Sequence, residues 1–282
     1  MFVVLDKHFS GQLSHNIEDY PEGIVIPVDK PYRWTSADVV RKLKYAACHH
    51  FGKKKLKVGH AGTLDPLATG VLLVCVGPAT RQAEALQSHD KEYIAGVTFG
   101  ATTPSYDLEK EIDRRFPYEH ITEESIREAL QGFVGEQEQI APLFSAKSVD
   151  GVRAYELARK IYRESGNIDA AAEDLIRRSI ITISDIELLG FSAEGIGVVE
   201  GPVEESRASL RINVTDNSAL GLPHADIRIA CTKGTYIRAF ARDLGEALGS
   251  GAHLDGLVRS RSGIFCVADA MSVEDILKFF SW

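Results

Sequence analysis

The segment from Gly59 to Gly70 (GHAGTLDPLATG) carries the residue types best suited to chemistry. Its one carboxylate is Asp65, and the following Pro66 restricts the backbone of Asp65 to an extended conformation. The glycines permit tight turns and the close approach of a ligand. Such a segment can present one acid rigidly, although a turn in which Asp65 caps the backbone is the alternative. No Gly-Lys-Ser/Thr follows the glycines, which excludes a phosphate-binding P-loop of the usual form.

A second candidate segment runs from Cys231 to Arg238 (CTKGTYIR), where a strand is expected to turn into a helix. Arg238 and Arg242 lie four residues apart and so share one helix face. An arginine close to Asp65 would stabilise its ionised form. The alternative is that these arginines pair with Asp243 or Glu246, and the sequence alone does not pair Asp65 with Arg238.

Positive charge is concentrated in residues 30–60, although the whole chain has a net charge of −8. This basic segment contains one acid, Asp38, and nine basic residues: Lys30, Arg33, Arg41, Lys42, Lys44, Lys53, Lys54, Lys55 and Lys57. A local basic surface on an acidic protein can still hold a polyanion, because the field acts over about 10 Å at 0.1 M salt. A solvated helix face with a polar loop is the equally plausible alternative.

Length and composition define the class of protein. The chain has 282 residues, of which 44% are hydrophobic and 26% charged, as in one large or two small globular domains. Its longest apolar run, 71–76, is too short to span a bilayer, and the N-terminus has no signal-peptide pattern. The four cysteines are scattered, which is typical of reduced thiols in a cytoplasmic protein and not of a zinc site.

Hydrophobic periodicity predicts the elements that position these residues. Residues 1–23 show no clear period, and residues 59–70 are predicted to form a structured loop. Strands are predicted at 23–29, 71–76, 92–99, 180–189, 208–214 and 225–231, and helices at 35–47, 122–133, 151–162, 237–248 and 274–280. Because helices and strands are mixed without strict alternation, we expect an α+β fold.

Several segments, in order along the chain, resemble the motifs of the TruB family of tRNA pseudouridine synthases. Gly59 to Gly70 resembles the catalytic motif of that family. The supporting motifs are Asp29-Lys30-Pro31, Asp90-Lys91-Glu92-Tyr93, Ser145-Ala146-Lys147 with Gly151 to Glu156, Lys233 to Arg238, and Gly251-Ala252-His253-Leu254. The similarity extends from about residue 23 to 265.

The resemblance implies a pseudouridine synthase fold, with a mixed, mostly antiparallel central sheet, flanking helices and an RNA-gripping insertion. It implies that uridine 55 in the T-loop of tRNA is isomerised to pseudouridine without a metal or any other cofactor. The resemblance also implies a role for each matching residue. Asp65 is the catalytic carboxylate, Arg238 pairs with it, and Tyr93 stacks on the target base. The residues that line the pocket or contact RNA are His60, Tyr236 and Leu257, and those that support the core are Lys30 and Pro31.

This chemistry requires the base to leave its stack, since the sugar–base bond is inaccessible inside folded RNA. Asp65 could attack C1′, add to C6 of the uracil, or remove the 2′ proton, and the sequence does not select among these routes. The basic segment would then clamp phosphates. We expect a monomer that needs no protein partner and does not bind a membrane.

The predicted organisation is an N-terminal extension at 1–23, a catalytic domain at 24–265 with its insertion at about 138–166, and a short C-terminal tail at 266–282. Three features depart from the family pattern: no room remains for a C-terminal RNA-binding domain, Phe144 stands where a tyrosine is expected, and residues 190–207 look like an added acidic loop.

Four other functions fit part of this pattern. A tRNA-folding chaperone would keep its biological effect without Asp65. A glycoside hydrolase would need a partner acid about 5–9.5 Å away, and none is evident beside Asp65. A structural protein would not need the Asp65 and Arg238 motifs. A synthase guided by separate RNAs and protein partners has a similar core, but the missing C-terminal domain argues against it.

Overall fold

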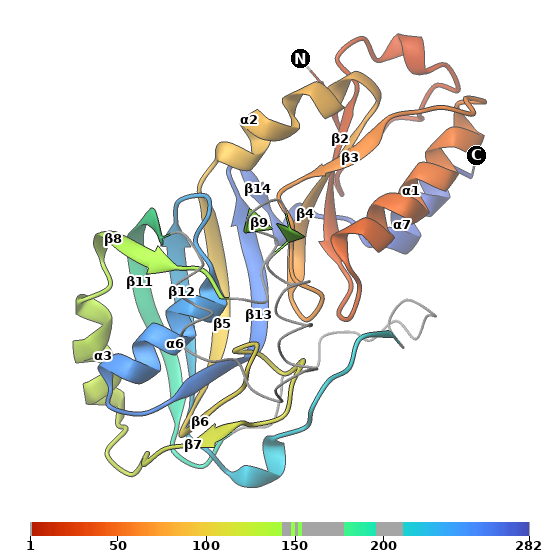
Figure 1. Cartoon of the computed structure of the whole chain (residues 1–282). Coiled ribbons are helices and arrows are strands. Elements are labelled where there is room, and N and C mark those ends of the chain that lie inside the picture. The colour runs from red at the N-terminus through yellow and green to blue at the C-terminus, as the bar shows by residue number, and fades with distance from the viewer. Residues whose placement is uncertain (1, 143–147, 150–151, 154–177, 196–210, 282) are drawn as a thin grey trace. The chain divides into compact units, whose positions relative to one another are not determined.

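Figure 1 shows the chain as a computed structural model, which describes residues 2–142, 148–149, 152–153, 178–195 and 211–281. The chain divides into two units. We call them the terminal unit, which contains described residues 2–93, 211–212 and 258–281, and the central unit, which contains the described residues of 94–195 and 213–257. Strands β5 (Lys91–Phe99) and β13 (Ala252–Ser262) each contribute residues to both units.

The sheet of the terminal unit is built around β4 (Thr69–Val76). Strand β2 (Ile24–Lys30) runs antiparallel to β4 along one edge, from Ile24 opposite Val76 to Lys30 opposite Gly70. Along its other edge, β4 pairs first with β13 in parallel and then with β3 (Val58–Ala61) antiparallel. Strand β1 (Val3–Val4) lies parallel to β2, and β14 (Phe265–Cys266) pairs with β13.

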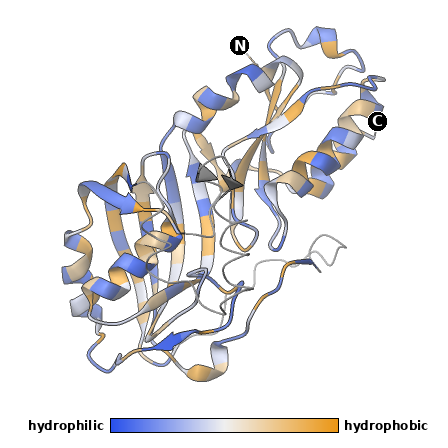
Figure 2. Ribbon diagram, viewed as in Figure 1, coloured by the Kyte–Doolittle hydropathy of each residue, from blue (hydrophilic) through white to orange (hydrophobic). Residues whose placement is uncertain are grey.

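Both faces of β4 are buried, as its continuous apolar sequence predicts. Alternate residues Val71, Leu73 and Cys75 pack with Leu86 of α2 (Ala83–Ser88), which follows a 3-10 helix at Gly77–Gln82. Helix α1 (Ser36–His50) also packs against β3 and β4. In Figure 2 the hydrophobic colour of the terminal unit is concentrated in these strands.

Local chemistry explains where α1 begins. The Thr35 hydroxyl accepts a hydrogen bond from the Asp38 amide, and the Asp38 carboxylate accepts one from the Thr35 amide. This reciprocal capping box satisfies two donors that the first turn leaves without intrahelical partners. Helix α7 (Val273–Phe279) begins after Ser272 and packs against α1.

The N-terminal residues belong to the core of the terminal unit, although their sequence shows no periodicity. Besides forming β1 and a 3-10 helix at Ile17–Asp19, they bury Leu5 and Leu13. The rings of His15 and His50 stack with centroids 4.4 Å apart, and each imidazole bonds to a backbone carbonyl of the opposite segment. The described residues before 23 therefore close the unit at the end of α1.

The central unit has the strand order β13-β5-β12-β11-β8. Strands β8 (Gly135–Ile140) and β12 (His224–Cys231) flank β11 (Arg178–Ser192), and both run antiparallel to it. Two short antiparallel pairs join β6 (Ala101–Thr102) with β7 (Arg114–Arg115) and β9 (Ser148–Val149) with β10 (Val152–Arg153). A further 3-10 helix lies at Ser218–Leu220, and the terminal unit has another at Val267–Asp269.

Two helices cover one face of the central sheet (Figure 1). Helix α3 (Glu123–Gln131) begins after the predicted cap Thr122 and packs against β11 and α6 (Ile237–Ala247). The rings of Phe133 and Phe240 meet edge to face with centroids 5.2 Å apart. Mixed parallel and antiparallel pairing with flanking helices confirms the predicted α+β fold.

Four sequence predictions need correction. Within the predicted loop 59–70, residues 59–61 belong to strand β3, which pairs with β4, and residues 69–70 belong to β4, which pairs with β13. Residues 190–192 continue β11, so they are not part of an added loop. Residues 211–214 form no strand, and residues 152–153 are strand, not helix. The remainder of the predicted 151–162 helix, the Ser145-Ala146-Lys147 motif with Phe144, and residues 196–210, which include the start of the predicted strand 208–214, lie outside the described residues.

The described residues contain neither a membrane-spanning helix nor a metal-binding cluster. None of the helices among them has the length and apolarity needed to cross a membrane. Among the same residues, no group of three or more His, Cys, Asp or Glu side chains is arranged to hold a metal ion.

Candidate active site

Asp65 lies on a loop of residues 62–68, here called the Asp65 loop, which leaves β3 and returns into β4. Gly62 begins this loop and Gly70 lies in β4 just after it, with φ angles of 95° and 93°, in the region that favours glycine. The Asp65 side chain is partly exposed, and the Asp65 carbonyl accepts a hydrogen bond from the Ala68 amide. The loop thus forms a turn immediately after the candidate carboxylate.

The corner between β2 and α1 holds the backbone on both sides of Asp65. The buried hydroxyl of Ser36 donates to the Leu64 carbonyl at 3.1 Å and accepts from the Leu64 amide at 2.9 Å. The Pro66 carbonyl accepts from the Arg33 amide at 2.9 Å and from Lys30 Nζ at 3.1 Å. The residues before and after Asp65 are therefore each anchored to this corner.

Arg259 on β13 holds the beginning of the Asp65 loop. Its side chain is 2% exposed, and its Nε donates to the Val71 carbonyl at 2.7 Å. Its Nη1 and Nη2 donate to the carbonyls of Thr63 at 3.3 Å and Gly62 at 3.4 Å. The planar guanidinium can reach three carbonyls at once because its donors point in fixed, divergent directions.

The end of the Asp65 loop is held where β4 meets β13. Gly70 lies opposite Arg259 in the parallel ladder, and a Cβ at Gly70 would come 2.3 Å from the Arg259 carbonyl oxygen. The Gly70 amide donates to the Asp29 carboxylate at 3.1 Å. Burial raises the pKa of Asp29, while the bond from Gly70 opposes that shift.

Lys30, predicted to support the core, is buried with 1% exposure. Its amine donates to the carbonyls of Pro31, Trp34 and Pro66, and these three acceptors match the three donors of a protonated amine. Burial lowers the pKa of Lys30 to about 7, an effect that the charge of Asp65 opposes. The predicted supporting role of Lys30 and Pro31 is consistent with these contacts, but Lys30 is not available to bind phosphate.

His60 and Tyr93 also lie in the terminal unit. Burial, reinforced by the charge of Arg259, lowers the pKa of His60, so its imidazole is neutral near pH 7. Tyr93 lies on β5 and is 9% exposed. Its neighbour Lys91 is buried and donates to the carbonyls of Gln87 and His89, so the start of β5 is tied to the end of α2.

The second predicted segment lies at the start of α6 in the central unit. Arg238 is buried, donates to the Ser105 carbonyl at 3.1 Å and lies 3.7 Å from the Asp107 carboxylate. Tyr236 is held through its backbone, which exchanges two hydrogen bonds with the Gln139 side chain. The pairing of Arg238 with Asp65, and the contacts of Tyr236 and Leu257 with substrate, stay predictions.

Arg242 confirms one of the alternative pairings. Its guanidinium bonds to the Asp243 carboxylate at 2.8 Å, as considered from the sequence, but it is buried and not at the surface. It also donates to the Ile140 carbonyl and lies over the Tyr106 ring. Arg242 therefore ties α6 to its surroundings within the central unit.

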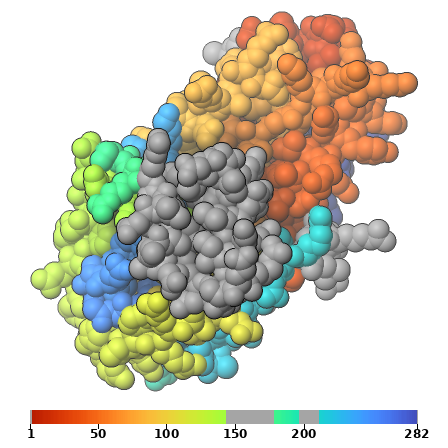
Figure 3. Space-filling model, viewed as in Figure 1, coloured from red at the N-terminus to blue at the C-terminus, as the bar shows by residue number. Residues whose placement is uncertain are grey.

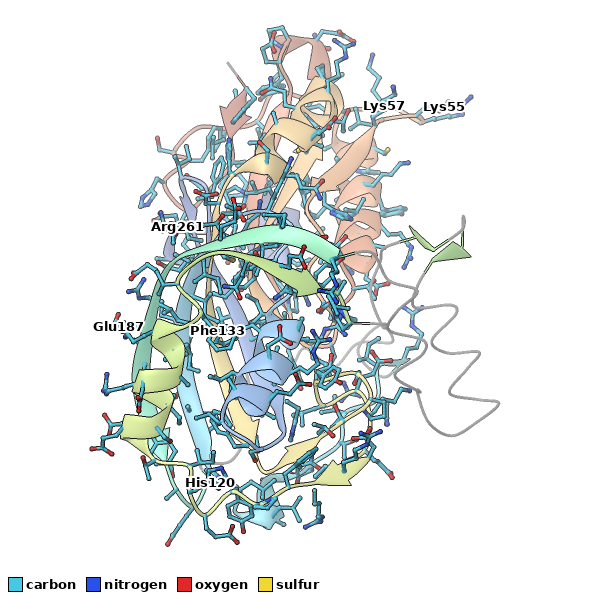
Figure 4. All side chains as sticks on the ribbon, turned by 60° about the vertical axis from the view of Figure 1, so that its left-hand side comes forward. Lys55, Lys57, His120, Phe133, Glu187 and Arg261 are labelled. Atoms are coloured by element: carbon cyan, nitrogen blue, oxygen red, sulfur yellow. The ribbon has the colours of Figure 1, made fainter. Side chains whose placement is uncertain are left out.

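The basic segment is partly neutralised by local partners. Arg41 pairs with Asp38, which Arg211 also contacts, and Lys53 pairs with Glu18. Arg33 donates through two side-chain nitrogens to the Ile212 carbonyl. The exposed lysines are Lys42, Lys44, Lys53, Lys54, Lys55 and Lys57. Figure 3 shows this part of the chain, in orange, at the surface, and Lys55 and Lys57 extend outward in Figure 4.

Sequence reasoning missed Ser36 and Arg259. Ser36 follows the helix cap Thr35, so the local pattern assigns it only to the first turn. Arg259 is a charged residue within a strand and lies 188 residues from Val71, one of its partners. Neither residue carries a local signal, because both act on backbone groups that are distant in sequence.

Known proteins resemble this chain over most of its length. Residues 49–198 match the family described as TruB family pseudouridylate synthase (N terminal domain). A tRNA pseudouridine synthase B from Phocaeicola vulgatus is 50% identical over 91% of this chain and 92% of its own length. Another from Bacteroides fragilis is 46% identical over 94% of this chain and 95% of its own length.

A solved structure supports the fold. A chain in the crystal structure of a Cbf5–Nop10–Gar1 complex matches with a TM-score of 0.58 and 26% identity. The match covers 93% of this chain but only 56% of that one.

Together these similarities define the class, an isomerase that makes pseudouridine. More specifically, the chain belongs to the TruB family of pseudouridine synthases.

Proposed function

We propose that this protein isomerises uridine 55 in the T-loop of tRNA to pseudouridine, with Asp65 as the catalytic carboxylate. The observation that carries the proposal is the position of Asp65. It is the one carboxylate of a loop whose backbone is bonded by Ser36, Lys30 and Arg259, in a chain of the TruB family. A rigid loop of this kind holds an acid in a fixed geometry for reaction at one carbon of the substrate.

The remaining residues take supporting roles in this proposal. Tyr93 stacks on the uracil after the nucleotide leaves the loop, an interaction worth about 1–3 kcal/mol. Arg238 pairs with Asp65 and stabilises its ionised form. His60, Tyr236 and Leu257 line the pocket or contact RNA. Asp65 then attacks C1′, adds to C6 or removes the 2′ proton, after which the uracil turns and rejoins the ribose through C5.

The test is tritium release from tRNA labelled at C5 of uridine, because forming the new bond at C5 expels that hydrogen. Wild-type protein is expected to release tritium, and Asp65→Asn, which keeps the shape but not the charge, is expected to release none while still binding tRNA. Asp269→Asn changes an exposed carboxylate elsewhere in the terminal unit and should leave release unchanged.

Two results would contradict parts of the proposal. If wild-type protein binds tRNA but releases no tritium, the chaperone alternative is favoured. If Asp65→Asn is as active as wild type, the protein is a synthase but Asp65 is not its catalytic residue. A tRNA in which the T-loop uridine is replaced should give no release from any variant.

We also propose that the exposed lysines of the basic segment bind tRNA phosphates. Neutralising Lys54, Lys55 and Lys57 should reduce the slope of log K for tRNA against log salt by roughly 0.9 or less for each lost contact. Lys278→Gln, which removes an exposed lysine paired with Asp275, is the control. An unchanged slope in the triple variant would refute this interface.

We further propose a cellular location, an oligomeric state and a catalytic domain for the protein. The protein acts in the cytoplasm as a monomer, without a metal or organic cofactor and without an obligate protein partner. Its catalytic domain spans residues 24–265, and the N-terminal residues and helix α7, which pack into the terminal unit, support that domain.

A further inference from the structure

The Asp65 loop is held by side chains at consecutive backbone positions. Arg259 donates to the carbonyls of Gly62 and Thr63, and Ser36 bonds to both polar backbone groups of Leu64. Asp65 itself is followed by Pro66, whose carbonyl accepts from Lys30 Nζ. Hydrogen bonds thus restrain the backbone immediately before and after the carboxylate.

Ser36 has a particular place among these contacts. Its single hydroxyl donates to the Leu64 carbonyl and accepts from the Leu64 amide, so it uses both of its hydrogen-bonding capacities on one residue. Leu64 directly precedes Asp65, and both Ser36 and Leu64 are buried, with 2% and 4% exposure. If the Ser36 hydroxyl were removed, water would therefore have little access to bond with Leu64 in its place.

Ser36 is not needed to begin α1. The helix is capped by Thr35 and Asp38, which bond to one another's backbone amides. Ser36 occupies the first helical position, where alanine is well tolerated. A Ser36→Ala substitution therefore removes the contact with Leu64 while leaving the helix cap in place.

We infer that Ser36 and Arg259 are positioning residues for Asp65: they set the backbone of the Asp65 loop so that the carboxylate meets the ribose or uracil in a reactive geometry. The inference rests on the proposed role of Asp65. Neither residue touches substrate in this account, since each acts through backbone groups: Ser36 through Leu64, and Arg259 through the carbonyls of Gly62, Thr63 and Val71. Displacement of a reacting group by about 1 Å can reduce a rate by 10²-fold.

The decisive experiment compares single-turnover rates at saturating tRNA with the dissociation constant for tRNA. Ser36→Ala should reduce the rate by roughly ten- to one-hundred-fold and change the dissociation constant by less than about twofold. Ser36→Thr keeps the hydroxyl and should recover most of the rate. A general loss of folding would not produce this selective effect on the chemical step.

Ser250→Ala is the matched control. Ser250 is also buried, with 4% exposure, and donates its hydroxyl to a backbone carbonyl, that of Pro117. Its loss should leave the single-turnover rate within about twofold of wild type. Arg259→Lys keeps a buried cation but lacks the planar fork, and it should reduce the rate at least as much as Ser36→Ala.

The outcomes separate this inference from the proposed function. An unchanged rate for Ser36→Ala, a change in tRNA affinity alone, or an equal loss for Ser250→Ala would overturn the positioning role while Asp65 remains catalytic. Failure of Ser36→Thr to recover activity would also overturn it. Full activity of Asp65→Asn would instead refute the premise. If Arg259→Lys does not fold, the Ser36 series still decides.

Discussion

Two buried polar clusters of this protein are built in different ways. Around the Asp65 loop in the terminal unit, the buried cations Lys30 and Arg259 donate chiefly to backbone carbonyls. In the central unit, the buried His224 bonds instead to side chains, with Nδ1 2.6 Å from Asp255 and Nε2 3.3 Å from Asp226. Here, too, a strand is tightly packed, because a Cβ at Gly96 would come 2.2 Å from Asp255.

The difference concerns the acceptors, which are carbonyls in the first cluster and carboxylates in the second, although the pKa of the donor Lys30 in the first cluster is also lowered to about 7. A carbonyl oxygen cannot lose or gain a proton in the physiological range, so its bond to a guanidinium fixes the backbone regardless of pH. Imidazole changes charge near neutral pH, so the His224 cluster responds to pH. The first arrangement holds a reactive loop in place, and the second links three neighbouring strands through charge, since Thr98 of β5 also donates to Asp255.

The largest change in stability is expected from disrupting the contact between Gly70 of β4 and Arg259 of β13. In Gly70→Ala, the new Cβ would meet the Arg259 carbonyl oxygen at 2.3 Å, and the residue would keep a φ of 93°. We expect the free energy of unfolding to fall by about 3 kcal/mol or more, because backbone strain and a clash add. Chemical denaturation of the purified variant measures this.

Gly52→Ala separates these two causes. Gly52 has a φ of 60°, but a Cβ there would meet nothing within 4 Å. The substitution should therefore cost only about 1 kcal/mol of backbone strain. Equal losses for the two variants would show that the approach of Arg259 to Gly70 does not constrain the loop.

The His224 cluster should give a smaller effect that depends on pH. Burial alone would lower the pKa of His224, but hydrogen bonds and charge from Asp255 and Asp226 outweigh it and raise the pKa above 6.5. The folded state thus binds the proton more tightly than the unfolded state. Its stabilisation is complete below pH 6.5 and is lost as pH rises through the folded-state pKa.

The measurement is the free energy of unfolding between pH 6 and pH 8. As the pH rises over this range, the free energy of unfolding of the wild type should fall by on the order of 1 kcal/mol more than that of His224→Gln. His120→Gln is the control, since His120 lies exposed in the same unit and bonds to the Leu248 carbonyl (Figure 4). If wild type and His224→Gln show the same pH dependence, the comparison between the two clusters fails.

Most elements with regular periodicity could be predicted from sequence. The apolar run at 71–76, the capped helices after Thr35 and Thr122, and the strand ending at Phe99 are all present. Strand β3 could not be predicted, because its four residues include a glycine and show no clear apolar pattern, and they gain their conformation from pairing with β4. The N-terminal residues likewise join the core through scattered apolar side chains that follow no period.

The candidate site likewise has some features that the sequence predicts and others that depend on the fold. The sequence by itself determined the chemically capable residues, Asp65 and its flanking glycines and proline, and the excess of lysine and arginine in residues 30–60. Only the tertiary structure decided that Lys30 is buried beneath the loop and that Ser36 and Arg259 hold its backbone. The bonds to the loop join residues between 28 and 197 positions apart. Their acceptors are backbone carbonyls, which every type of residue carries. Such contacts leave no local pattern, since any residue can supply the oxygen once the fold brings it within reach.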